Sequence, residues 1–162
     1  MKLAFNMKTH NILSINDFKT IIGSNSRLIG IDPGGKNIGI AICDENQSVA
    51  TPLKTIKRNK FENILSEINT IISENSIKGI VVGNPINMDG SIGKSSQSAT
   101  DFSKNLSKNI TIPITMWDER LSSEASFKIT KELGTNVTSR VKKLDKNAAA
   151  FILQGIIDFL SN

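Results

Sequence analysis

Short hydrophobic runs come first along this chain, and stretches with helical spacing follow them. Three runs in the first third have strand character, over 28–32, 37–43 and 49–56. In the second run large apolar residues alternate with small ones, which is typical of a strand packed beside an antiparallel neighbour. Pro52 cannot donate a ladder hydrogen bond, so the third run belongs at a sheet edge. The pattern predicts a three-stranded meander.

After this meander, hydrophobic residues recur at helical spacing. Ile64, Ile68 and Ile71 fall on one face of a predicted helix. The later elements are predicted as strands 77–83 and 112–117 and helices 60–75, 94–108, 123–133 and 145–160, with a basic loop over 134–143. Strands joined through helices should be parallel neighbours. The order βββαβαβα therefore predicts an α/β protein with one mixed five-stranded sheet flanked by helices.

Helix-ending and polar residues near position 26 divide the chain into two parts. Residues 1–26 are mostly polar and hold a short predicted helix, 17–22, that Gly23 ends. Residues 27–162 have the length of one domain with a single core. We expect an N-terminal extension, 1–26, to pack against a domain formed by 27–162.

Composition narrows the class of partner. The chain has 162 residues, a net charge of +5, no Tyr and eight Phe and Trp residues in total. This balance favours an anionic partner held through its backbone over bases stacked on an aromatic platform. No apolar run approaches the roughly 20 residues of a membrane span. We expect a cytoplasmic protein without a membrane partner, and the single cysteine, Cys43, excludes an internal disulfide.

Three carboxylates occupy positions where a charge is costly. Asp32 ends the first predicted strand, Asp118 or Glu119 ends the strand 112–117, and Asp145 lies on the apolar stripe of the last helix. Each has an ordinary alternative, as a turn former, a partner of a nearby cation or a helix cap respectively. Together at one rim they would form an oxygen-rich site for Mg²⁺ or Mn²⁺.

Cations near this rim are candidates for holding phosphate. They are Lys36, Arg120, Arg140, Lys142 and Lys143. Such contacts would position a nucleic acid strand without reading its sequence. Arg120 has an alternative role, holding Glu119 in place. The loop 87–91 could aim backbone N–H groups at a phosphate or form a self-satisfied turn.

Five motifs in order carry a family resemblance. They read GIDPGGKNIGIA, ATPLKTI, VVGNPINMDGSIGKSSQSA, WDERLSSEAS and KKLDKNAAAFILQGIID. Over about residues 27–160 the chain resembles the YqgF (RuvX) family of Holliday-junction-resolvase-like proteins, regarded as pre-16S rRNA nucleases. The resemblance implies an RNase H-like fold and an acidic site at Asp32, Glu119 and Asp145. The chain departs from the family pattern at Gly35, Asn37 and Asn84, where Thr, Arg and Leu respectively are usual.

The resemblance implies an Mg²⁺- or Mn²⁺-dependent nuclease that matures the 5′ end of pre-16S rRNA, with the small ribosomal subunit precursor as a further partner. One alternative is a DNA endonuclease that resolves branched, four-way junctions, and another is a catalytically silent nucleic-acid-binding protein. The stretch 32–36 also resembles the phosphate loop of actin-like sugar kinases. Those enzymes close two lobes around ATP, whereas this chain has the length of one.

Overall fold

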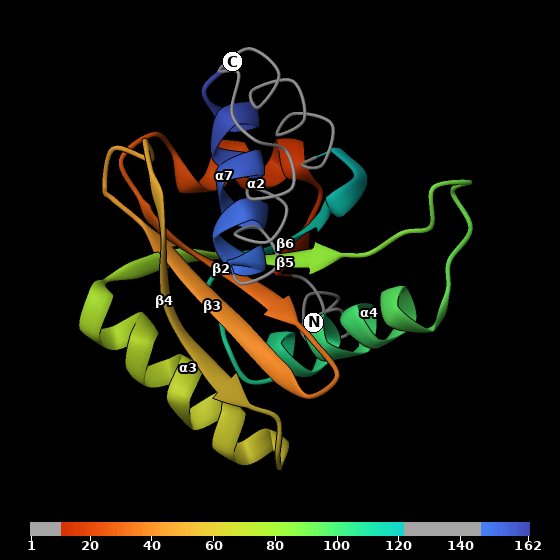
Figure 1. Cartoon of the computed structure of the whole chain (residues 1–162). Helices are drawn as coiled ribbons and strands as arrows, with labels where there is room; N and C mark the ends of the chain where they lie inside the picture. The colour runs from red at the N-terminus through yellow and green to blue at the C-terminus, as the bar shows by residue number, and fades with distance from the viewer. Residues whose placement is uncertain (1–10, 122–146) are drawn as a thin grey trace, which may run out of the picture.

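The computed structural model describes residues 11–121 and 147–162. Six strands form one sheet in the order β1-β6-β5-β2-β3-β4, with helices on both of its faces (Figure 1). The strands are β1 (Ile12–Leu13), β2 (Arg27–Pro33), β3 (Asn37–Cys43), β4 (Ala50–Lys57), β5 (Ile77–Asn84) and β6 (Ile114–Asp118). The helices are α2 (Ile15–Ile22), α3 (Phe61–Asn75), α4 (Lys94–Ser107) and α7 (Ala148–Leu160).

The predicted meander and the parallel half of the sheet are both confirmed. β2 runs antiparallel to β3 and parallel to β5, and β5 runs parallel to β6. β4 pairs with β3 and lies at the edge, as Pro52 indicated. The carboxyl ends of β2, β5 and β6 therefore meet at one end of the sheet, where open α/β sheets bind ligands. We call this end the active rim.

The predicted strand count was wrong by one. β1 adds a sixth strand, parallel to β6, with Ile12 beside Ile114 and Leu13 beside Thr115. A strand of two residues is too short to show an alternating pattern. The Asn11 side chain also binds this segment to the residues before β6, because its amide donates to the carbonyl oxygens of Ile110 at 2.7 Å and Ile112 at 3.0 Å.

The short N-terminal helix is confirmed and begins two residues before its predicted start. Ser14 accepts a hydrogen bond from the backbone N–H of Asp17, as a helix cap does, and Gly23 ends α2 with a φ of 69°. Phe18 is fully buried. Residues 12–22 thus belong to the packed structure, while the division into an extension and a domain stays a prediction.

Two hydrophobic cores lie on opposite faces of the sheet. Alternate residues of the strands face α3 and α4 on one side, such as Ile29, Ile31 and Ile80. The others face α7 and α2, such as Leu28 and Val81. Figure 1 shows α7 and α2 together on one side of the sheet and α3 and α4 on the other. Side-chain parity along a strand therefore decides which layer a residue meets.

Other predicted elements match the structure within a few residues where it describes them. The helix 123–133, the basic loop 134–143 and the first residues of the predicted last helix lie outside the described residues. Among the helices of the described ranges, none has the length and apolarity to cross a membrane.

Candidate active site

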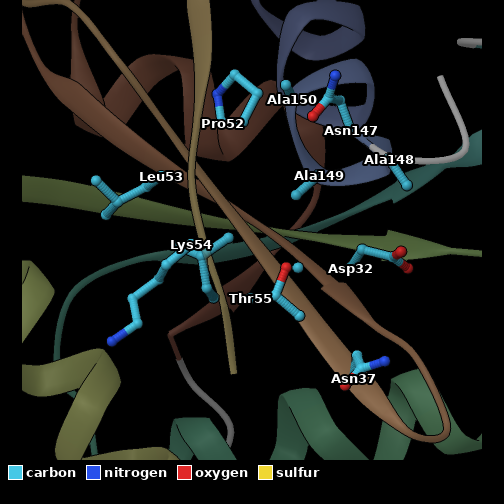
Figure 2. Close-up of a pocket in the computed structure, with 12 residues that line it drawn as sticks. Asp32, Asn37, Pro52, Leu53, Lys54, Thr55, Asn147, Ala148, Ala149 and Ala150 are labelled. Atoms are coloured by element: carbon cyan, nitrogen blue, oxygen red, sulfur yellow. The ribbon is translucent and has the colours of Figure 1, made fainter. Parts of the chain in front are cut away.

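Asp32 lies at the active rim on the face of the sheet covered by α7. It has the parity of Leu28, which packs in the α7 core, and it pairs with Gly39 of β3. A methyl group on Gly39 would lie 3.6 Å from Asp32 Cβ and 3.4 Å from Ala149 Cβ. Asp32 is therefore next to the first turn of α7 (Figure 2). Burial raises the pKa of its carboxyl group above the ordinary value.

Glu119 faces the same layer from the end of β6. β6 ends at Asp118, and Glu119 follows it in a short helical turn. The Glu119 carboxylate lies on the α7 side, because a methyl group on Gly83 would touch both Glu119 Oε1 and Ile152, a residue of the α7 core. Burial, with smaller contributions from the charges of Asp32 and Asp118, raises the pKa of Glu119 to about 7. Asp32 and Glu119 are therefore close enough to repel each other.

Gly83 of β5 separates these two acids in the sheet. β5 lies between β2 and β6: Val82 pairs with Ile31 of β2, and Gly83 pairs with Trp117 of β6. A methyl group on Gly83 would lie 2.7 Å from Glu119 Oε1 and 2.5 Å from Ile152 Cδ1. The missing side chain is what gives the Glu119 carboxylate its space.

Asp118 forms an ion pair with Arg120. Arg120 Nη2 lies 2.7 Å from Asp118 Oδ2, and Arg120 Nε donates to both oxygens at 3.0 and 3.1 Å. These bonds hold the pKa of Asp118 below its ordinary value. The structure thus pairs Arg120 with Asp118, and the predicted role of Arg120 in holding Glu119 stays a prediction. A phosphate contact by Arg120 stays a prediction.

A hollow of about 370 Å³ opens beside Asp32. Its wall comes from β3, from the edge strand β4 and from the start of α7, as Figure 2 shows, and includes Asn37, Thr55 and Asn147. Lys54, also on this wall, is engaged elsewhere, since its Nζ lies 2.9 Å from Glu67 Oε1. The hollow gives a polar ligand access to Asp32 from the side of β4.

The third predicted acid, Asp145, lies outside the described residues, as do Arg140, Lys142 and Lys143. Within 11–121 and 147–162, no three His, Cys, Asp or Glu side chains gather closely enough to hold a metal ion. Asn147, two residues after Asp145 in the sequence, lines the hollow beside Asp32. The complete triad stays a prediction. The described pair fits a divalent cation chemically, because a cation would offset the burial that raises both pKa values and the repulsion that adds to that of Glu119.

Arg58 is a site residue that the sequence reasoning missed. Its Nη1 donates to the carbonyl oxygen of Gly34 at 2.8 Å, and its backbone N–H donates to that of Lys36 at 2.9 Å. Both bonds hold the turn between β2 and β3, directly after Asp32. The sequence does show a cation just after the third predicted strand. Its contact with the turn could not be predicted, because it depends on the antiparallel register of β4 with β3. Lys36 is exposed on the turn, and its phosphate contact stays a prediction.

The loop between β5 and α4 is largely self-satisfied. Asp89 Oδ1 accepts hydrogen bonds from the N–H of Ser91 at 2.8 Å and from its hydroxyl at 2.6 Å, and Gly90 N–H donates to Asn87 O at 2.8 Å. These bonds favour a turn over a phosphate loop. Asn84, a departure from the family pattern, accepts from the Ser96 hydroxyl at 2.6 Å and fixes the start of α4.

Comparison with known proteins adds to this geometry. A family model described as "RuvX: Holliday junction resolvase" matches residues 26–159. A protein of Pelagibacter ubique named "Putative pre-16S rRNA nuclease" is 52% identical over 151 residues, which are 93% of this chain and 100% of the relative. A protein of Ruegeria pomeroyi with the same name is 44% identical over 149 residues, 92% of this chain and 97% of the relative.

Two solved structures share the fold at low sequence identity. The yeast mitochondrial Holliday junction resolvase aligns with a TM-score of 0.55 at 12% identity, over 91% of this chain and 84% of that one. Thermus thermophilus RuvC in complex with a Holliday junction substrate aligns with a TM-score of 0.51 at 12% identity, over 83% and 96%. The RNase H-like fold is thereby confirmed. With the match over 26–159 and relatives at 44–52% identity, the chain belongs to the RuvX family.

Proposed function

We propose that this protein is a divalent-metal-dependent nuclease whose main substrate is the 5′-extended precursor of 16S rRNA. The observation that carries the proposal is the pair of half-buried carboxylates, Asp32 and Glu119, at the active rim, with the pKa of Glu119 raised to about 7. The names of the relatives support nucleic acid as the substrate and pre-16S rRNA as its first candidate.

In this proposal Asp32, Glu119 and Asp145 hold Mg²⁺ or Mn²⁺. Carboxylates suit these ions, which keep bound waters for contact with a substrate phosphate. A bound ion would lower the pKa of a water molecule and stabilise the charge on the leaving oxygen. The ion would also favour the ionised form of Glu119 at neutral pH, since opposite charge lowers a carboxyl pKa.

The remaining residues position the strand. Arg58 holds the Gly34–Lys36 turn, so Lys36 can offer its ammonium group to a phosphate close to Asp32. Arg120 orients Asp118 away from the carboxylate pair and places a guanidinium group at the same rim. Arg140, Lys142 and Lys143 are proposed as further phosphate contacts because they precede Asp145 in the sequence.

The test uses a 5′-extended 16S precursor RNA, free and within small-subunit precursor particles, with Mg²⁺, Mn²⁺ or EDTA. The expected result is cleavage that needs a divalent ion and falls at least about 100-fold in Asp32→Asn and Glu119→Gln. Glu74→Gln is the matched control, because Glu74 is an exposed carboxylate on α3. Metal-independent binding without cleavage would instead indicate a silent binding protein.

Junction resolution is the second candidate. The family description and the aligned resolvase structures favour it. A four-way DNA junction is therefore incubated in parallel with the RNA. Cutting of the junction alone would assign the same carboxylates to DNA.

A further inference from the structure

A second concavity lies on the opposite face of the sheet. It has a volume of about 400 Å³ and is formed by the segment after β4, by the first turn of α3 and by one side of α4. Its floor is apolar, from Phe61, Ile64 and Phe102, and its wall is polar, from Arg58, Asn59, Lys94, Gln97, Ser98, Asp101 and Asn105. We call it the α3/α4 groove.

The groove connects to the active rim through Arg58. β4 runs antiparallel to β3, so its last residue, Lys57, pairs with Asn37 next to the β2–β3 turn. Arg58 donates to Gly34 and Lys36 of that turn and also lines the groove. A chain lying across Lys36 from Asp32 would therefore reach the groove directly.

Positive charge accumulates along this path. Its cations are Lys36 and Lys57 at the β2–β3 turn, Arg58 and Lys94 on the groove wall, and Lys60 at the N-cap of α3. The ion pairs among residues 11–121 and 147–162 are Lys54–Glu67 and Arg120–Asp118, so neither neutralises any of the five. The acids nearby are fewer: Glu62 in the first turn of α3, and Asp101, which accepts from the Gln97 amide at 3.1 Å. The balance favours an anionic ligand.

The groove also offers contacts for a base. The Arg58 guanidinium lies 5.7 Å from the centre of the Phe102 ring, and Phe61 meets Phe102 edge to face at 6.1 Å. Guanidinium planes stack on unpaired bases, and the amides of Asn59 and Gln97 can hydrogen-bond to base edges. In a duplex the bases are already stacked and paired, so this combination suits a single strand.

We propose that the α3/α4 groove binds one unpaired nucleotide of the substrate strand, on the far side of the β2–β3 turn from the bond that is cleaved, with its phosphate between Arg58 and Lys94. This deepens the proposed function and rests on it for the identity of the strand. It assigns the face opposite α7 to substrate binding, whereas Asp32 and Glu119 lie on the α7 face.

The test measures binding of fluorescein-labelled single-stranded RNA by anisotropy in EDTA, at several salt concentrations. Lys94→Ala should weaken binding on the order of 3- to 10-fold and reduce the salt slope by about 1. The matched control is Lys108→Ala, at the other end of α4. Equal affinities and slopes for the two variants would overturn the proposal.

Two further measurements separate binding from structure. Arg58→Lys keeps the positive charge but loses the planar guanidinium group that could stack on a base, so it should weaken single-strand binding more than duplex binding. Equal losses of affinity for both would count against the groove. The Tm of each variant reports any damage to the β2–β3 turn. If wild-type protein binds the strand and shows the Lys94 effect without cleaving, the groove stands and the proposed function fails. If wild-type protein cleaves and Lys94→Ala behaves as Lys108→Ala, the groove fails alone.

Discussion

At the scale of single residues, the candidate site depends on the faces that adjacent side chains take. From the sequence, either Asp118 or Glu119 could have completed the acid pair with Asp32. The structure brings Glu119 beside Asp32, because its carboxylate lies next to Gly83 and Ile152 on the α7 side and the Asp32 charge acts on it. Strand alternation alone left the choice between the two open, whereas the family resemblance implied Glu119, the acid that lies beside Asp32 in the structure.

The raised pKa of Glu119 predicts how stability depends on pH in metal-free protein. The unfolded chain ionises near the ordinary value of 4.5, and the folded protein holds the proton up to about 7. Protonated Glu119 therefore stabilises the fold at low pH, and this contribution is lost as the pH rises from about 4.5 through about 7. Urea unfolding in EDTA should show falling stability across this window. Glu119→Gln should flatten the fall, and an unchanged profile would contradict the assignment.

Gly83→Ala should disturb the site by steric pressure. The new methyl group would press on Glu119 Oε1 and Ile152 Cδ1, and overpacking of this kind costs about 1–3 kcal/mol. We expect loss of cleavage on the order of tenfold or more, because the carboxylate is displaced. Gly35→Ala is the matched control, since a methyl group there has no neighbour within 4 Å. Equal cleavage by the two variants would refute the positioning role of Gly83.

At the scale of elements, α7 and the N-terminal segment complete the face that carries the acids. α7 lies close to the sheet because Gly30, Gly39 and Gly83 present no side chains to Ala149, Ile152 and Leu153. The sequence predicted α7 from its apolar stripe and the main strands from their alternation. The sequence analysis missed β1 because a strand of two residues shows no alternation. It missed the bonds of Arg58 to the β2–β3 turn because they depend on the register between β3 and β4.

Phe18→Ala tests how strongly α2 supports the fold. Phe18 is fully buried and its ring approaches Gly79, where a methyl group would lie 2.7 Å from Cζ. Loss of a buried Phe side chain costs about 3–5 kcal/mol. Ile21→Ala on the same helix, where the side chain is 61% exposed, should change stability by no more than about 0.5 kcal/mol. Chemical denaturation measures both, and similar values would show that α2 is only loosely attached.

At the scale of the whole molecule, one end of the sheet gathers the carboxylates and most of the charge proposed to bind substrate. The net charge of +5 indicated an anionic partner, but only the fold shows that Lys36, Arg58 and Lys94 come from separate elements to the same end. Composition reports how many charges a chain has. Their arrangement depends on strand direction, which is why the α3/α4 groove was not foreseen.

Divalent ions should stabilise the whole protein through the acid pair. A ligand that binds only the folded state adds about 2.7 kcal/mol when its concentration is 100 times its Kd. Mg²⁺ or Mn²⁺ should therefore raise the Tm of wild-type protein at neutral pH, and EDTA should reverse the shift. Asp32→Asn should lose most of this effect, while Glu74→Gln should keep it. Equal shifts in both variants would place ion binding elsewhere.

Two acids stand in succession where β6 ends, Asp118 as its last residue and Glu119 directly after it, and they lie on opposite sides of the sheet. Deleting or inserting a single residue within β6 would exchange their roles, sending the Arg120-paired acid towards α7 and Glu119 to the opposite layer. The spacing between the hydrophobic anchor Trp117 and Glu119 is thus as restrictive as the identity of the acid itself. Length variation in this family should accordingly be tolerated in loops and selected against inside this strand.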